Sequence, residues 1–536
     1  MRNRFILCIF LLLGFSTSYA QLDYGNTWYK SAPNRTYIRL VVDNDGIYRT
    51  TMADLSGAGF DLSQVNPDNL KLYYRGKEVP MFVKKSGGQL LFIEFFGKRN
   101  NGQIDSIMYR SPTSGIHEPD LQPNKRISIF SDESVYYLTW DNTPSGNRYF
   151  NIFDPTYSLL TPEPNFKYTA WKEYTHGVSG NEYVRGGGGP YDSFYTLNSD
   201  YVTGEGYVGP GFAYGDPYTE KVATPAAANT GSPVKVTMRV FGRSNTQHLL
   251  RVEMNGNSTT PVLDTAINTS VIYIKTYERD YTPPGQLTAI TDLTYQANRA
   301  NTDNNNICFS AITYDRLPNM NGDSTLRITG WNKTSKSYIK LENFAGKDTV
   351  YAYDLANNIR HKGLITTSGG NKSANIILLG FPNTRDVFIA TDAGVRKPRI
   401  EASRFNKLYD PAQGAEFVII ANRQLAASAL AYAQYRDTAT VNPVSVKIVY
   451  TDEIYDEYSY GTITPWALKR FCKDALDHWT VKPRYFFLWG KGKFITRGHE
   501  GEPLRLHSAT RLMTMNLSAT LTSNLLRSLL RRLSGG

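Results

Sequence analysis

The sequence has 536 residues, of which 41% are hydrophobic and 20% are charged, and this balance excludes a disordered or collagen-like chain. The formal net charge is +11, but the first 20 residues contribute +2 of it and residues 498–536 contribute +3. The positive charge that remains on the rest of the chain is too small to favour nucleic-acid binding. The abundance of Tyr (37), Gly (43) and Pro (26) favours strands and turns over long helices.

The first 20 residues predict a signal peptide. A positive start, Arg2 and Arg4, precedes an apolar run at residues 5–15. The small residues Ser18 and Ala20 then give the pattern that a signal peptidase reads before Gln21. The apolar run is too short for a membrane span, which needs about 20 residues. We therefore expect an exported protein.

Residues 21–145 predict a first β-rich domain. Short apolar segments alternate with turn residues, as at 37–42, 70–74, 90–96, 127–130 and 135–140. The segment Asp43-Asn44-Asp45-Gly46 offers oxygen atoms of the kind that calcium prefers, but it lacks the later ligands of a calcium loop. A hairpin turn is the simpler interpretation of this segment.

Residues 146–230 predict an irregular connection, because their periodicity is weak and they contain a glycine run at 186–189. No Gly-Lys-Ser/Thr follows these glycines, so they do not form a phosphate loop. Residues 231–400 predict a second β domain of sandwich or jelly-roll type. Its expected strands, at 234–241, 249–254, 271–275, 326–328, 337–341 and 349–353, are separated by Asn, Asp and Gly turns.

The pattern changes in residues 411–497, where β and helical segments alternate. Residues 417–420 form a short apolar strand, 424–436 an Ala-rich helix and 444–450 a second strand. Thr464 is placed to cap a helix that begins at Pro465, and residues 485–489 form a third strand. The helix carries apolar residues on or near one stripe, namely Trp466, Phe471, Ala475 and Trp479.

This alternation predicts the start of a parallel α/β sheet. Ligand chemistry on such a sheet would lie at the carboxyl ends of the strands, near Ala421, Thr451 and Gly490. Cys472 falls on the last predicted helix among apolar neighbours, so we interpret it as a buried, unreactive thiol. With Cys308, it makes only two cysteines after the leader, too few for a disulfide framework.

The same segment resembles the opening of a gingipain-type (C25) cysteine peptidase domain. The resemblance rests on the stretches Phe417-Val418-Ile419-Ile420, Val446-Lys447-Ile448-Val449, Thr451-Asp452-Glu453-Ile454-Tyr455-Asp456-Glu457, Thr464-Pro465 and Pro483-Arg484-Tyr485-Phe486-Phe487-Leu488-Trp489-Gly490. The preceding β domains resemble the propeptide-like and β-rich regions of the long members of this family, which act as the sortase of the type IX secretion system. The resemblance implies two β-rich domains followed by the start of an α/β caspase-like (gingipain) domain.

The resemblance also implies a Cys nucleophile and a His partner on later strands, but it supplies neither in this sequence. Gly490 is followed by Lys491-Gly492-Lys493, where the family has acidic and hydroxyl residues. Gly498-His499-Glu500 follows the third strand too early to be the catalytic His-Gly element. Four other histidines stand alone and are interpreted as structural, namely His117, His176, His248 and His361. We predict no catalytic, cofactor-binding or metal-binding residue and no cofactor.

The composition changes in residues 498–536. Of the 31 residues from Leu504 to Ser534, 20 are Leu, Arg or Ser, and no Tyr follows Tyr485. We interpret this tail as the out-of-frame end of a truncated reading frame. The alternative is a genuine basic amphipathic helix, with its Leu residues at 521, 525, 529 and 533 on one face, that contacts a membrane or a partner.

These observations support two hypotheses on function. The first is an exported C25 peptidase or sortase of the periplasm, cell surface or outer membrane, inactive as this chain, whose family cuts exported proteins near their C-terminal sorting signals. Its expected partners are those exported substrates and components of the secretion system, not nucleic acid. The second is a non-catalytic cell-surface β-sandwich protein for binding or structure. Reading the DNA downstream of codon 490 in the other two frames would separate them.

Overall fold

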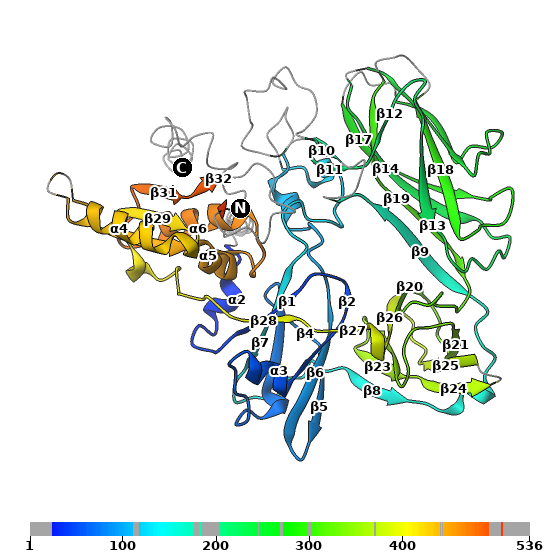
Figure 1. Ribbon diagram of the computed structural model, residues 1–536, viewed down its shortest axis with the longest axis horizontal. Helices are drawn as coiled ribbons and strands as arrows, with labels where there is room; N and C mark the ends of the chain where they lie inside the picture. Colours follow the sequence, from blue (N-terminus) through cyan, green and yellow to red (C-terminus); the bar gives the residue numbers. More distant parts are fainter. Residues whose placement is uncertain are drawn as a thin grey trace, which may run out of the picture.

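The computed structural model describes residues 24–110, 117–175, 182–184, 201, 203–244, 246–267, 272–297, 303–368, 371–439, 441, 443–492 and 505–506. The signal peptide predicted at 1–20 and the glycine run at 186–189 lie outside these residues. So does the tail predicted at 498–536, except for residues 505–506. β-Rich domains followed by an α/β segment with a parallel sheet make up the described chain, as the predicted fold class requires (Figure 1).

The N-terminal β domain consists of two sheets, with the strand orders β28-β1-β7-β3-β4 and β27-β2-β6-β5. Buried side chains that include Leu40, Leu72, Ile93 and Phe95 form its core. The elements are α2 (Thr27–Lys30), β1 (Ile38–Val42), β2 (Gly46–Thr51), α3 (Met52–Gly57), β3 (Leu70–Tyr74), β4 (Lys77–Val79), β5 (Phe82–Ser86), β6 (Gln89–Gly97), β7 (Ser134–Trp140), β27 (Val395–Arg396) and β28 (Arg399–Ala402).

This domain is discontinuous in sequence. β28 pairs with β1 in antiparallel register, and β27 pairs with β2 in parallel register, so residues 395–402 belong to both sheets of the N-terminal domain. The predicted range 21–145 does not include these strands, and the predicted second domain 231–400 contains β27 and the first half of β28. Local periodicity cannot reveal a pairing between segments that lie more than 300 residues apart.

The middle of the chain forms a β-sandwich whose two sheets have the orders β12-β19-β14-β17, with β9 on β19, and β13-β18-β15-β16. Its strands are β9 (Phe166–Glu173), β12 (Gly211–Phe212), β13 (Tyr218–Ala223), β14 (Val234–Gly242), β15 (His248–Met254), β16 (Leu263–Ile267), β17 (Tyr273–Tyr281), β18 (Ile290–Ala297) and β19 (Asn305–Arg316). Beside it, β10 (Glu182–Val184) pairs with β11 (Gly206–Val208).

A further pair of sheets follows, with the orders β20-β26-β22-β23-β8 and β21-β25-β24, around a core that includes Ile328, Ile339, Ile376 and Ile389. Its strands are β8 (Phe150–Phe153), β20 (Thr325–Trp331), β21 (Ser337–Glu342), β22 (Val350–Asp354), β23 (Ile359–Lys362), β24 (Leu364–Ser368), β25 (Asn371–Leu378) and β26 (Arg385–Thr391). Sheet pairing thus divides the single sandwich predicted at 231–400. The stretch 146–230, predicted to be irregular, supplies β8, β9, β12 and β13.

The α/β segment contains a parallel sheet of order β30-β29-β31, made of β29 (Phe417–Ala421), β30 (Val446–Tyr450) and β31 (Tyr485–Trp489). Three helices connect these strands, α4 (Ala426–Asp437), α5 (Thr451–Tyr458) and α6 (Pro465–His478). Side chains of β29 alternate between two cores. Ile419 packs with Ala429 and Ala433 of α4, whereas Val418 packs with Leu468 and Phe471 of α6.

Local signals in this segment behave as predicted. Thr464 caps α6 by accepting a hydrogen bond from the backbone N–H of Trp466 at 3.3 Å, and Pro465 occupies the first helical position. The remaining short elements are β32 (Lys491–Gly492), β33 (Arg505–Leu506) and the 3₁₀ helices at Pro67–Asn69, Asp105–Met108, Pro119–Leu121, Thr156–Leu159, Asp392–Gly394, Pro411–Gln413 and Arg423–Leu425.

Candidate functional site

The carboxyl ends of the three parallel strands form the edge at which chemistry is expected in an open α/β sheet. Ala421 is level with Tyr450 on one side and with Trp489 on the other, so the strands end together. Gly490, directly after β31, has a φ of 145°, a conformation that glycine adopts readily and other residues do not. The three positions predicted from the sequence, Ala421, Thr451 and Gly490, therefore lie at one edge of the sheet.

An ion-pair network occupies the β29 and β30 side of this edge. The Nε of Arg423 donates to Asp452 Oδ2 at 2.5 Å, and its Nη2 donates to Glu453 Oε1 at 2.7 Å. The guanidinium lies 4.3 Å from the centre of the Tyr450 ring. Burial lowers the pKa of Arg423, but the hydrogen bonds to Asp452 and Glu453 outweigh it, so the pKa is raised overall. This network holds fixed charges and no nucleophile.

The two thiols are poorly suited to nucleophilic chemistry. Cys472, which was predicted to be buried, is only partly buried on α6, beside the core between the helix and the sheet. Desolvation still raises the pKa of its thiol far above the ordinary value. Cys308 lies on β19 with no exposed surface, and burial raises its pKa to about 12. Because the thiolate is the nucleophile, a raised pKa disfavours nucleophilic chemistry by either group at neutral pH.

The described histidines have structural surroundings. His248 is buried and its Nδ1 lies 2.5 Å from Asp303, and His478, in the last turn of α6, has its Nδ1 2.6 Å from Asp474. Burial lowers the pKa of His361 to about 4, and the ring of His117 hydrogen-bonds to a backbone carbonyl. No imidazole hydrogen-bonds to a thiol in the described part of the chain. His176 and the segment 498–500 lie outside it.

The acidic segment Asp43-Asn44-Asp45-Gly46 connects β1 to β2, which lie in different sheets, so it is a corner and not the hairpin turn that was predicted. Protein donors occupy its oxygen atoms. Asp43 accepts from the Tyr48 hydroxyl at 3.2 Å, and Asp45 accepts from the Arg99 N–H at 3.0 Å. The described residues contain no group of three or more His, Cys, Asp or Glu that could hold a metal ion.

Three carboxylates of α5 and α6 that no sequence signal singled out, those of Asp456, Glu457 and Asp474, are each at most 1% exposed. Asp456 accepts from the Tyr137 hydroxyl at 2.8 Å and faces Arg39 at 3.3 Å, and both of these residues belong to the N-terminal domain. Carboxylates on a short helix are usually solvent-exposed. Their burial is the most unusual polar feature of the α/β segment.

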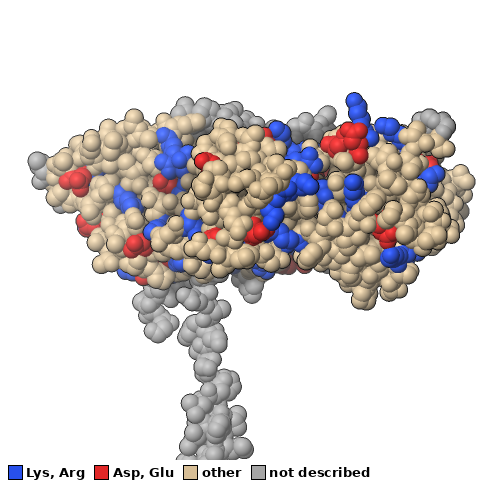
Figure 2. All heavy atoms as spheres, turned by 90° about the horizontal axis from the view of Figure 1, so that it is seen from below, with Lys and Arg blue, Asp and Glu red and all other residues tan. Residues whose placement is uncertain are grey.

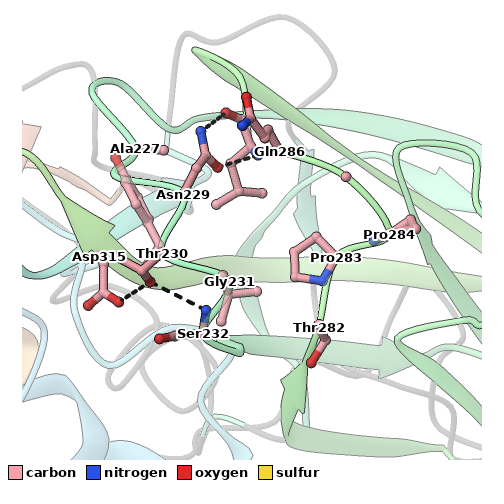
Figure 3. A pocket seen from close by; sticks show the side chains of 14 residues that line it. Ala227, Asn229, Thr230, Gly231, Ser232, Thr282, Pro283, Pro284, Gln286 and Asp315 are labelled. Carbon is pink, nitrogen blue, oxygen red and sulfur yellow. Dashed lines mark hydrogen bonds between the residues drawn. The ribbon is translucent and has the colours of Figure 1, made fainter.

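A cleft of about 270 Å³ lies at one end of the β-sandwich, between the loop containing Asn229 and the loop containing Pro283 and Pro284 (Figure 3). The polar groups of the cleft hydrogen-bond to one another across its two loops. Asn229 exchanges two hydrogen bonds with the Leu287 backbone, at 2.8 and 3.1 Å, and Thr230 donates to Asp315 at 2.8 Å. The cleft is therefore a loop junction, and nothing in it selects a ligand.

Charged side chains of both signs share the surface. On the face seen in Figure 2, Lys and Arg gather near the middle, and Asp and Glu lie among and beside them. Several basic residues of the N-terminal domain are paired, as Lys71 is with Asp141 at 2.6 Å and Lys85 with Asp68 at 2.7 Å. In the part of the chain that the structure describes, no helix is long and apolar enough to cross a membrane.

Comparison with solved structures shows a fold similar to that of dimeric latent PorU from Porphyromonas gingivalis. The TM-score is 0.51 at 15% sequence identity, over 85% of this chain and 42% of that one. This chain thus spans less than half the length of that protein. The CBM36-1 domain of a xylanase from the hindgut metagenome of Trinervitermes trinervoides (9% identity, 27% of this chain, 95% of that domain) and a xylan-binding CBM15 module (14%, 28% and 97%) have TM-scores of 0.16 and 0.17, too low to establish a common fold.

Sequence comparison locates the family signal in the α/β segment. No curated protein matches the sequence. The model of Peptidase family C25 matches residues 410–516, which include β29, β30, β31 and the helices between them. The family match confirms the resemblance to peptidase family C25 that was predicted from residues 417–490, and the PorU-like fold agrees with it.

Proposed function

We propose that this protein serves type IX secretion as a sortase-type C25 peptidase, which cuts exported proteins near their C-terminal sorting signals. The observation that carries the proposal is the family match over the parallel β30-β29-β31 sheet, supported by the PorU-like fold. The substrates would be exported proteins, and the partners would be components of the secretion system. The signal peptide predicted at residues 1–20 agrees with an exported site of action.

We further propose that residues 24–492 supply scaffold and not the nucleophile. Cysteine peptidases need a thiolate within hydrogen-bond reach of an imidazole, together with donors for the oxyanion. Neither Cys308 nor Cys472 has such a partner among the described residues, and burial favours the neutral thiol in both. The chain by itself is therefore expected to be inactive. Its β30-β29-β31 edge, with the Arg423 network, would form one wall of the reaction site.

Two measurements test these proposals. Deleting the gene in the source organism should leave exported proteins with their sorting signals attached, as detected by mass spectrometry of surface proteins. Unchanged cleavage in the deletion strain would refute the sortase assignment. In the second measurement, the purified chain should not react with thiol-directed peptide inhibitors. Labelling of Cys472 that disappears in Cys472→Ala would refute the proposed inactivity.

A further inference from the structure

Two segments lie between the N-terminal β domain and the α/β segment. One is the N-terminal arm, residues 24–30, which includes α2, and the other is the strap, residues 403–409, which joins β28 to the α/β segment (Figure 1). Helix α5 binds the backbone of the strap through hydrogen bonds. Glu457 accepts the N–H groups of Asn406 and Leu408, at 2.6 and 2.9 Å, one on each carboxylate oxygen. Glu457 therefore fixes the strap at two residues, Asn406 and Leu408, which are separated by one residue.

The other two buried carboxylates extend this attachment. Asp456 accepts the N–H of Arg404 at 2.6 Å, in addition to its contacts with Tyr137 and Arg39 of the N-terminal domain. Asp474 of α6 accepts from the side chain of Asn26 in the arm at 3.1 Å. Each carboxylate therefore joins the α/β segment to residues that belong to, or lead into, the N-terminal domain.

Aromatic rings enclose this contact. The Tyr29 ring of the arm stacks on Phe405 of the strap, with centroids 4.1 Å apart, and Trp28 packs against Tyr137 at 5.2 Å. Tyr29 and Tyr137 are each 1% exposed. Water is thus excluded from the carboxylates while the two units are in contact, and an ionised carboxylate without a cation is costly in such a place.

Glu457 differs from the other two carboxylates in its charge partners. Asp456 faces Arg39, and Asp474 lies 3.8 Å from Lys30, whereas Glu457 has no cation within ion-pair distance among the described residues. The titratable groups that face Glu457 are Glu453, Asp456 and Tyr458 of α5, Tyr29 of the arm, Tyr409 of the strap and Lys447 of β30. Burial raises the pKa of Glu457 to about 8, and the two N–H bonds only partly oppose this shift.

We propose that the arm, the strap and the carboxylates of Asp456, Glu457 and Asp474 form a pH-sensitive clasp, which holds the N-terminal domain on the α/β segment in neutral and mildly acidic solution and loosens in alkaline solution. The inference does not depend on peptidase activity. Closing the clasp keeps a proton on Glu457, which a solvated glutamate would release above about pH 4.5. The stabilisation from this proton is complete below that pH and is lost as the pH rises through about 8.

The size of the effect follows from the two pKa values of Glu457. With about 4.5 in the open state and about 8 in the closed state, the equilibrium for closing falls on the order of 10- to 100-fold between pH 6 and pH 9. Opening also affects the sheet edge, because the Arg404 side chain lies 3.7 Å from Asp452 of the ion-pair network. The clasp thus connects the position of the N-terminal domain to the edge formed by β29 and β30.

Hydrogen–deuterium exchange of the full chain at pH 6 and pH 9, corrected for intrinsic exchange rates, tests the proposal. Protection of the strap amides at 406 and 408 should fall by 10- to 100-fold at pH 9, whereas protection of β14 in the sandwich should not change. Glu457→Gln, which cannot ionise and resembles the protonated glutamate, should lose this pH response. Glu342→Gln, at an exposed position on β21, should keep the full response.

Three results would overturn the proposal. One is equal strap protection at both pH values in the unmodified chain, a result that does not depend on any variant. Another is a pH response that persists in Glu457→Gln, because the titrating group would then lie elsewhere. If β29 loses protection together with the strap at pH 9, the whole α/β segment has opened, and the clasp is not a separate device.

Discussion

Trp479 offers a direct test of how the strap is anchored. Its side chain is 1% exposed, its indole N–H donates to the Leu408 carbonyl at 2.7 Å, and its ring lies 5.7 Å from that of Phe471. Trp479→Phe removes the donor and keeps most of the apolar contact, so it leaves the buried carbonyl without this donor and should cost about 1–3 kcal/mol. Trp479→Ala also leaves a cavity and should cost about 3–5 kcal/mol.

Urea unfolding, combined with exchange of the strap amides, measures both costs. Trp171→Phe is a matched control, because Trp171 is 38% exposed, and it should change the free energy of unfolding by less than about 0.5 kcal/mol. The reasoning predicts the order Trp479→Ala, then Trp479→Phe, then Trp171→Phe, from most to least destabilised. A Trp479→Phe variant as stable as the unmodified chain would refute the role assigned to the indole N–H.

Three further perturbations test other parts of the structure. Arg39→Met leaves the buried Asp456 without its ion-pair partner and should lower the free energy of unfolding by about 3–5 kcal/mol in urea titrations, and Asp456→Asn added to it should recover part of the loss. Thr51→Ala breaks the capping box at the start of α3 and should cost about 1 kcal/mol in thermal unfolding. Burial lowers the pKa of His361 to about 4, so protonation of the unfolded imidazole should reduce stability by up to about 3 kcal/mol as the pH falls from 7 to 4, and His361→Phe should remove this part of the acid sensitivity.

Sequence reasoning succeeded where the structure depends on neighbours in the chain. Helix α6 begins at Pro465 with Thr464 as its cap, and Phe471 and Ala475 are buried, as their spacing predicts. The parallel strands and their common carboxyl edge also follow from the order of strand and helix. The cap and the apolar face of α6 are encoded within one helix, and the parallel sheet is encoded in the order of consecutive strands and helices.

Features that depend on distant contacts were not predictable. β28 looked like part of the second β domain, yet it pairs with β1 of the first. Asp456 and Glu457 were noted only as part of the stretch 451–457, with no expectation of burial, yet both are buried. Their partners, such as Arg39 and the strap amides, come from elsewhere in the chain, and a single sequence carries no local mark of such a pairing.

The return of β28 to the N-terminal sheet explains why these carboxylates can be buried at all. Because Arg399–Ala402 pairs with β1, the strap starts at a fixed point next to Arg39, and its next residues reach α5 with little freedom left to lose. A long flexible linker would lose more conformational entropy on forming the same hydrogen bonds. The discontinuous N-terminal domain thus pre-positions the donors that Asp456 and Glu457 require, which makes the domain contact and the burial of these charges interdependent.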